Sequence, residues 1–216
     1  MNVKKLIIVG AGGLGREVHF WLKDWIAHNP GHVLGGFLDD GSLSLNRFNH
    51  YADIISTIDD YEPKADEHLL CAIGKPGDKK YVVEKLLAKG AQFFSFVHSS
   101  VIVGENVKIG RGAIICPYSV LSVDLELGDF VTVNTMCTIS HDSYIGHFST
   151  LSLHCDVTGG AILEDEVFLG SRVSVLPKIR VGRGAVVGAG GVVVKNVAPG
   201  STVVGVPARE TASRNP

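Results

Sequence analysis

Residues 127–157 read LGDFVTVNTMCTISHDSYIGHFSTLSLHCDV, and every sixth residue of this stretch, starting with the first, is Leu, Val or Ile. The same period extends from Val103 to Val193, and all sixteen positions carry one of these three side chains. The residue two places earlier in each unit is nearly always small or β-branched, as at Ala113 and Cys137. A period of six keeps the alternation of a strand and adds a turn to every unit, and this combination is typical of a parallel β-helix.

Each six-residue unit is expected to form one wall of a three-sided prism, with its large aliphatic side chain inside. Three units close one coil, so residues 18 apart stack at the spacing of neighbouring strands, about 4.8 Å. The sixteen units correspond to a little over five coils. An ordinary β-sandwich would reproduce this period only by accident, and sixteen consecutive matches argue against that alternative.

The first 98 residues follow a different pattern, in which short apolar runs alternate with amphipathic stretches. The runs are residues 5–9, 33–38, 68–73 and 92–97, and the amphipathic stretches are residues 16–26 and 79–87. This alternation predicts a small parallel α/β domain. We therefore expect an α/β domain over residues 1–98, a β-helix domain over residues 99–198 and a C-terminal tail over residues 199–216.

A glycine-rich turn follows the first apolar run. Gly10, Gly12 and Gly15 have the spacing GxGxxG, in which glycine lets the backbone approach a phosphate at a helix N-terminus. Asp39 and Asp40 end the second run, where a dinucleotide fold carries a ribose-binding acid. Taken alone, this pattern suggests a NAD-dependent oxidoreductase. A domain of this size fits a mononucleotide better, and a purely structural glycine turn remains the alternative.

The composition excludes several classes of partner. Hydrophobic residues make up 45% of the chain, and the formal net charge is −2 from 20 basic and 22 acidic side chains. This balance of charges does not indicate a surface that binds nucleic acid or a membrane. No apolar stretch approaches the roughly 18 residues of a membrane helix. We expect a cytoplasmic protein without an integral membrane segment or a nucleic-acid partner, and a peripheral membrane partner stays open as an alternative.

Three of the nine histidines, at positions 141, 147 and 154, lie within the repeats. His141 comes two residues after the inward Ile139, and therefore lies at or beside a corner of the prism, where its side chain points outward. An imidazole with an ordinary pKa near 6.5 suits a general base, and Asp142 beside it would orient the ring. His147 falls on the next corner, too far away to share an ion, so no metal site is expected. An exposed corner histidine without a function is the alternative.

Both halves of the chain together resemble one family, the hexapeptide-repeat sugar acetyltransferases of the bacillosamine and sialic-acid type. In that family a Rossmann-like domain precedes a left-handed β-helix, and the resemblance covers nearly the whole chain. The left-handed coil is implied by this resemblance alone, because crossovers between parallel strands are ordinarily right-handed. It also implies acetyl-CoA as the acyl donor, a nucleotide-sugar substrate and a homotrimer. The matching segments are residues 10–15, 37–40, 72–74, 134–146, 188–190 and 205–209.

The resemblance assigns roles to individual residues. His141 would be the general base, Asp142 its orienting acid and Asn134 a nearby polar group. Gly159 stacks one coil after His141, so its backbone N–H is a candidate oxyanion donor near the thioester. The implied CoA contacts are Gly159, Gly188, Ala189, Gly190, Gly205, Pro207 and Arg209. The implied nucleotide-sugar contacts are Gly10, Gly12, Gly13, Gly15, Asp39, Asp40 and Gly74.

Two positions depart from the family pattern. Leu14 stands where the family usually has a histidine, and Thr150 stands where some relatives carry a histidine that touches the acyl carbonyl. A contact near the phosphates or the sugar is therefore in doubt, and so is the choice of acyl group.

The predicted function is acetyl-CoA-dependent N-acetylation of the amino group of a nucleotide-linked amino-deoxy sugar, with direct attack on the thioester. The alternatives are O-acetylation of a sugar such as a sialic acid, and a nucleotide-binding scaffold without catalysis. One structural expectation accompanies this function. Cys137 and Cys155 are 18 residues apart at the small inward position, and we expect them to stack as buried, reduced thiols.

Overall fold

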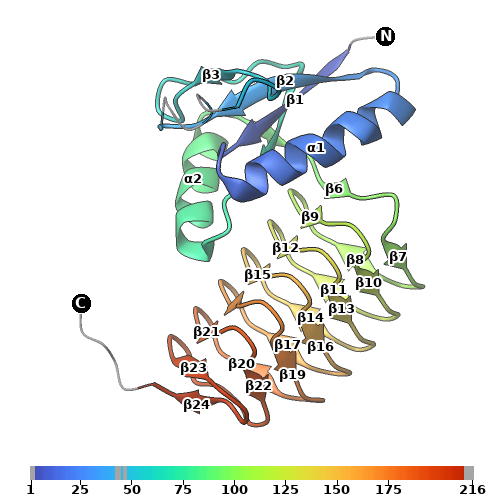
Figure 1. The fold of residues 1–216 in the computed structure, drawn as a ribbon, viewed down its shortest axis with the longest axis vertical. Coiled ribbons are helices and arrows are strands. Elements are labelled where there is room, and N and C mark those ends of the chain that lie inside the picture. The colour runs from blue at the N-terminus through green and yellow to red at the C-terminus, as the bar shows by residue number, and fades with distance from the viewer. Residues whose placement is uncertain (1–2, 42–44, 46–47, 212–216) are drawn as a thin grey trace. The chain divides into compact units, whose positions relative to one another are not determined.

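The computed structural model describes residues 3–41, 45 and 48–211. The chain divides into two compact units, Met1–Phe96 and Val97–Pro216 (Figure 1). Residues 212–216 of the predicted C-terminal tail lie outside the described residues.

The first unit is an α/β structure built on a parallel sheet with the strand order β3-β2-β1-β4-β5. Its strands are β1 (Lys4–Val9), β2 (His32–Leu38), β3 (Ile54–Ser56), β4 (Glu67–Cys71) and β5 (Gln92–Phe93). Its helices are α1 (Gly13–His28) and α2 (Pro76–Ala88). The short strand β3 was not expected. The predicted strand over 92–97 is two strands, because β5 joins this sheet whereas β6 (Phe96–Val97) joins the β-helix.

The register of the central strands explains where a ligand site can form. Val9 of β1 lies opposite Leu38 of β2 and Cys71 of β4. The carboxyl ends of these three parallel strands therefore meet at one edge of the sheet. Ligands of open α/β sheets bind at this edge.

The second unit is a parallel β-helix with three walls, and residues 18 apart pair in register, for example Val120 with Ile102 and with Thr138. The first wall contains β7 (Ile102–Val103), β10 (Val120–Leu121), β13 (Thr138–Ile139), β16 (Asp156–Val157), β19 (Ser174–Val175) and β22 (Val192–Val193). The second wall contains β8 (Lys108–Ile109), β11 (Glu126–Leu127), β14 (Tyr144–Ile145), β17 (Ile162–Leu163) and β20 (Arg180–Val181). The third wall contains β6, β9 (Ile114–Ile115), β12 (Thr132–Val133), β15 (Thr150–Leu151), β18 (Phe168–Leu169), β21 (Val186–Val187), β23 (Thr202–Val204) and β24 (Arg209–Glu210). The predicted β-helix is confirmed.

The interior of the prism contains the aliphatic residues of the six-residue period. From Ile115 to Val193 each of these side chains is at most 1% exposed. Val103 is 44% exposed, so the expectation that every unit fills the interior is wrong for the first one. The physical reason is that β7 is the end strand of its wall, and no earlier coil covers it.

The inward cysteines and the C-terminal segment complete the β-helix. Cys137 and Cys155 are buried free thiols, as predicted. The segment expected as a tail contains β23, which pairs in parallel with β21, and β24, which pairs antiparallel with β23. Within the described ranges, neither helix has the length and apolar composition needed to span a bilayer.

Candidate active site

The corner between β13 and β14 carries His141 and Asp142. The Nδ1 atom of His141 lies 2.7 Å from Oδ2 of Asp142, and the two side chains are 61% and 68% exposed. A carboxylate only accepts hydrogen bonds, so we assign the proton to Nδ1 and the lone pair to Nε2. The Nε2 atom is therefore free to accept a proton from a substrate.

Gly159 lies one coil further along the same corner. A Cβ atom placed on Gly159 would be 2.6 Å from Cε1 and 2.7 Å from Nε2 of His141, so the ring rests against the glycine backbone. The predicted stacking of these two residues is therefore observed. Among the described residues the Gly159 N–H has no hydrogen-bond partner, whereas the Gly159 carbonyl accepts the N–H of Lys178. An open N–H beside a basic nitrogen is suited to stabilise an oxyanion.

His147 occupies the equivalent position at the next corner, where it belongs to a hydrogen-bond ladder. Its Nδ1 accepts the backbone N–H of Asp129 at 2.9 Å, and its own backbone N–H donates to Oδ1 of Asp165 at 3.0 Å. The backbone N–H groups of Asp129 and His147 are thus used in structural bonds at this corner. In the part of the chain that the structure describes, no group of three His, Cys, Asp or Glu residues is arranged to hold a metal ion.

Asn134 and Thr150 do not share the corner of His141 within one chain. Asn134 follows β12 and lies at the corner before β13, where its Oδ1 accepts the N–H of Thr135 at 2.8 Å. Thr150 lies in β15, on the third wall. The predicted closeness of Asn134 to His141 therefore requires a second copy of the chain.

The segments matched to CoA contacts come together at the last coil. Gly188 lies against the residue before Gly205, because a Cβ on Gly188 would be 2.7 Å from Cγ1 of Val204. The N–H of Val192 donates to the carbonyl of Gly205 at 3.0 Å. Gly190 and Gly205 have φ values of 71° and 94°, which favour glycine. The remaining residues of the predicted set, Ala189, Pro207 and Arg209, belong to these same two segments.

In the first unit the glycine turn, Asp39 and the end of β4 converge as predicted. A Cβ on Gly15 would overlap the carbonyl oxygen of Gly10, and one on Gly10 would be 3.3 Å from the carbonyl oxygen of Ala72. The N–H of Ala11 donates to Oδ2 of Asp39 at 2.6 Å. The turn is thus held closely against both neighbouring strands. A Cβ added at Gly12, Gly13 or Gly74 would meet no atom within 4 Å, so the backbone is accessible there.

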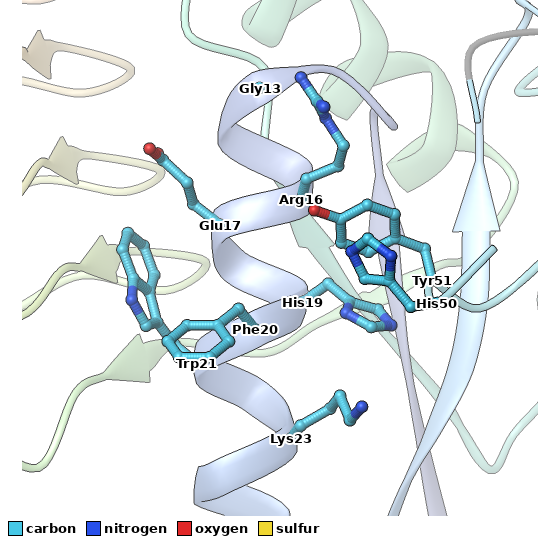
Figure 2. A pocket seen from close by; sticks show the side chains of 9 residues that line it. All are labelled: Gly13, Arg16, Glu17, His19, Phe20, Trp21, Lys23, His50 and Tyr51. Atoms are coloured by element: carbon cyan, nitrogen blue, oxygen red, sulfur yellow. The ribbon is translucent and has the colours of Figure 1, made fainter. Parts of the chain in front are cut away.

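The N-terminus of α1 is open toward a ligand. Its cap residue is Gly12, no side chain caps the helix, and its first turn carries no acid. A hollow of about 420 Å³ is lined by Gly13, by the cationic side chains of Arg16 and Lys23 and by one acid, Glu17 (Figure 2). Tyr51 also lines it. Unpaired helix N–H groups beside cations favour an anionic ligand.

Sequence reasoning named Gly13 but missed the other residues that line this hollow. Arg16 and Lys23 are seven residues apart on α1, and this spacing is a usable signal that they share a helix face. His50 and Tyr51 come from the loop after β2, and their rings lie 4.3 Å apart between centroids (Figure 2). His19 is a structural residue, because it is buried and its Nε2 accepts the N–H of Ala52 at 3.1 Å.

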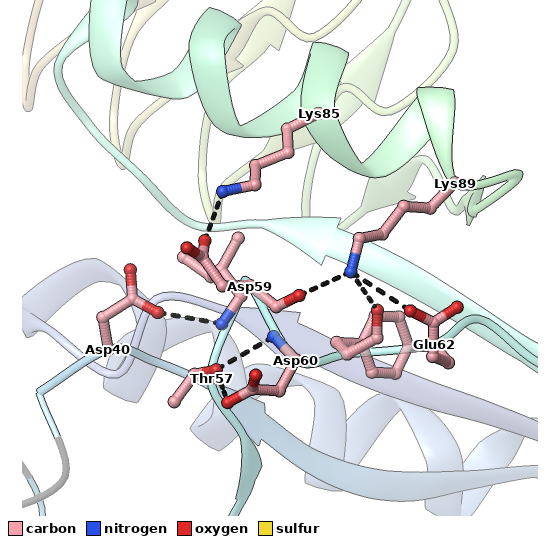
Figure 3. Close-up of polar contacts among 9 residues, drawn as sticks. Asp40, Thr57, Asp59, Asp60, Glu62, Lys85 and Lys89 are labelled. Carbon is pink, nitrogen blue, oxygen red and sulfur yellow. Dashed lines mark hydrogen bonds and ion pairs between the residues drawn. The ribbon is translucent and has the colours of Figure 1, made fainter.

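The two acids at the end of β2 are already engaged in backbone bonds. Asp39 accepts from Gly41 as well as from the glycine turn, at 2.8 Å. Oδ1 of Asp40 accepts the N–H of Ile58 at 2.9 Å, within a polar network that includes Asp59 and Lys85 (Figure 3). These bonds position the loops around the site. The predicted ribose contact of either acid stays a prediction.

Comparison with known proteins agrees with this geometry. Residues 5–86 match the family described as the PglD N-terminal domain. The chain is 29% identical over 209 residues to the GDP-perosamine N-acetyltransferase of Escherichia coli O157:H7, which covers 94% of each chain. WeeI from Acinetobacter baumannii AYE has a TM-score of 0.85 at 27% identity and covers 97% of this chain and 100% of that one. The acetyltransferase domain of PglB from Neisseria gonorrhoeae FA1090, solved in complex with acetyl coenzyme A, has a TM-score of 0.82 at 26% identity, over 97% and 100%. The resemblance to the hexapeptide-repeat sugar acetyltransferases is confirmed.

The protein is thus an acyltransferase, and the alternative of a scaffold without catalysis is set aside. The His141–Asp142 pair lies at an exposed corner of its β-helix. Leu14, one of the two departures from the family pattern, is the second residue of α1. A nonpolar side chain at this position provides no side-chain hydrogen bond to a ligand.

Proposed function

We propose that this acyltransferase transfers the acetyl group of acetyl-CoA to the amino group of a nucleotide-linked amino-deoxy sugar. The observation that carries the proposal is the 2.7 Å contact between His141 and Asp142, with the free side of the ring over Gly159. The similarity to a GDP-perosamine N-acetyltransferase supports the acceptor class. The similarity to a domain solved with acetyl coenzyme A supports the donor.

The geometry suggests the order of events. Nε2 of His141 accepts a proton from the amine, and the amine nitrogen attacks the carbonyl carbon of the thioester. Asp142 stabilises the resulting imidazolium, and the N–H of Gly159 donates to the oxyanion. The new C–N bond remains as the C–S bond breaks, and the CoA thiolate takes the proton from the imidazolium. No covalent acyl-enzyme forms.

We infer that the first unit is Rossmann-like and binds the nucleotide part of the acceptor. Its strand order β3-β2-β1-β4-β5 is the order of a dinucleotide fold, and the small size of the unit fits a mononucleotide better. The open N-terminus of α1 and the side chains of Arg16 and Lys23 supply donors and positive charge for phosphates. Calorimetry with UDP-, dTDP-, CMP- and GDP-sugars against NAD tests this inference. Micromolar NAD binding without a response to any nucleotide-sugar would reverse it.

We further propose a left-handed β-helix that assembles as a homotrimer in the cytoplasm, with active sites between neighbouring copies. Asn134 and Gly188 follow the same wall and share one corner, whereas His141 lies at the next corner. An interface between these two corners would unite all three. Four free cysteines agree with a reducing compartment. Light scattering that gives a monomer at micromolar concentration would contradict the trimer.

The activity itself is tested by incubating the full chain with acetyl-CoA and a series of nucleotide-linked amino sugars, with CoA release as the readout. Mass spectrometry and NMR of the product distinguish an amide from an ester. An ester product would support the O-acetylation alternative. Absence of CoA release with every amino sugar and every sialic acid tested would contradict the proposed substrate class.

A further inference from the structure

We propose that Gly159 is a positioning residue, whose missing side chain leaves the space in which the imidazole of His141 is held. This role is separate from the use of its N–H as an oxyanion donor, and it rests on the proposed function of His141 as the base.

The ring lies against the backbone of Gly159 at distances that no side chain would allow. A Cβ there would be 2.6 Å from Cε1, 2.7 Å from Nε2 and 3.3 Å from Nδ1 of His141. Ordinary van der Waals contact begins at 3.4 Å, so the ring would have to withdraw by about 0.8 Å, the difference between 3.4 and 2.6 Å. Such a movement displaces Nε2 and disturbs the 2.7 Å bond from Nδ1 to Asp142.

The backbone itself does not require glycine at this position. Gly160 has a φ of 69°, in the left-handed region, whereas Gly159 is not among the residues with positive φ. An alanine at 159 is therefore compatible with the local conformation. The atoms that it would meet belong to the end of an exposed side chain, which can rotate away at little cost in stability. The predicted consequence is a folded protein with a misplaced base.

The neighbouring corner shows what happens when this space is filled. Asp165, one coil after His147, bonds the backbone N–H of His147 at 3.0 Å. The ring of His147 instead bonds the preceding coil, through Nδ1 and the N–H of Asp129 at 2.9 Å. His141 has a glycine one coil later, and its ring lies toward that later coil. The ring over the glycine thus lies toward the later coil, whereas the ring beside Asp165 bonds the preceding coil.

The test is a double-mutant cycle on the full chain, with acetyl-CoA and the nucleotide-linked amino sugar of the series above that gives the fastest CoA release. Gly159→Ala should lower kcat by about 10²-fold, because a displacement near 1 Å of a reacting group has an effect of this order. The KM for the nucleotide-sugar and the melting temperature should stay near wild type. In the His141→Ala background the same substitution should have no further effect, because it acts through the imidazole. Val123→Ala, at the same corner one coil before His141, is the matched control and should retain full activity.

A second measurement keeps the two proposals apart. Nitrogen NMR of the His141 ring should show the loss of the Nδ1 hydrogen bond to Asp142 in Gly159→Ala, independently of turnover. If His141→Ala abolishes activity but Gly159→Ala leaves kcat and the ring signals unchanged, the positioning role is wrong and the base remains. An equal loss in both backgrounds would also overturn the positioning role. If His141→Ala leaves kcat unchanged, the proposed function of His141 itself fails.

Discussion

Substituting Gly15 by Ala should destabilise the α/β unit, because the added methyl group meets backbone rather than a flexible side chain. The new Cβ would overlap the carbonyl oxygen of Gly10 and lie 2.9 Å from its carbonyl carbon. Neither atom can rotate away. The turn must open instead, and opening it strains the 2.6 Å bond between the Ala11 N–H and Asp39.

The magnitude follows from overpacking in a rigid site. Inserting a methyl group into a closely packed position costs about 1–3 kcal/mol, and we expect roughly 2 kcal/mol here because a backbone atom is displaced. A unit of 60–100 residues loses about 4–8 °C in melting temperature per kcal/mol. The melting temperature of the α/β unit should therefore fall by roughly 8–16 °C if it unfolds independently.

The assay uses the chain's own fluorescence. The two tryptophans, Trp21 and Trp25, both lie in α1, so their emission reports the unfolding of this unit alone. Gly12→Ala is the matched control, because a Cβ there meets nothing within 4 Å and the φ of Gly12 is −70°. It should melt like wild type but bind a nucleotide-sugar more weakly if a phosphate lies against that backbone. If the tryptophan emission of Gly15→Ala showed unfolding at the wild-type melting temperature, the steric reasoning would be refuted.

Three further outcomes are expected. His141→Ala should lower kcat by about 10²–10⁴-fold in a folded protein. Asp142→Asn should lower kcat by less, because the base remains. A kcat near wild type in His141→Ala would exclude His141 as the base. Burial, Lys23 and His50 lower the pKa of His19 in the folded state, so the unfolded chain binds more protons and stability should be lost as the pH falls below about 6.5. Urea titrations at pH 5 and 7.5 should show a smaller difference in His19→Gln than in wild type. Cys137 and Cys155 are at most 1% exposed, so thiol reagents should label both cysteines only after denaturation. Labelling of either thiol in the native protein would contradict their inward register.

The β-helix was predictable because one physical requirement recurs in every unit. Each inward aliphatic side chain must be buried, and Leu127 and Val187 satisfy this requirement in the same way although they are 60 residues apart. The α/β unit has no such repetition. Its strand β3 is three residues long and half-exposed, so periodicity does not identify it. The division of residues 92–97 between two sheets likewise depends on tertiary pairing.

The candidate ligand site of the first unit was predictable only in part. The glycine spacing and the position of Asp39 after a strand follow from chain order, and the structure brings them together. The hollow beside α1 depends on where the loop with His50 and Tyr51 returns, and no local pattern determines that. The bond from Asp40 to the backbone of Ile58 is equally a consequence of the loop path.

The same reasoning explains why the sequence locates Gly159 but not the surroundings of Asn134. Along one corner of a β-helix, residues that are 18 apart in the sequence lie next to each other in neighbouring coils. The contact between Gly159 and the ring of His141 could therefore be predicted from their separation in the sequence. Asn134 and His141 are seven residues apart but lie at opposite ends of β13, so their closeness in sequence does not bring them together in one chain. A direct contact between them requires a second copy to place its Asn134 corner beside this His141. The double-mutant cycle at Gly159 therefore tests chemistry within one chain, whereas loss of activity in Asn134→Ala would test the interface between chains.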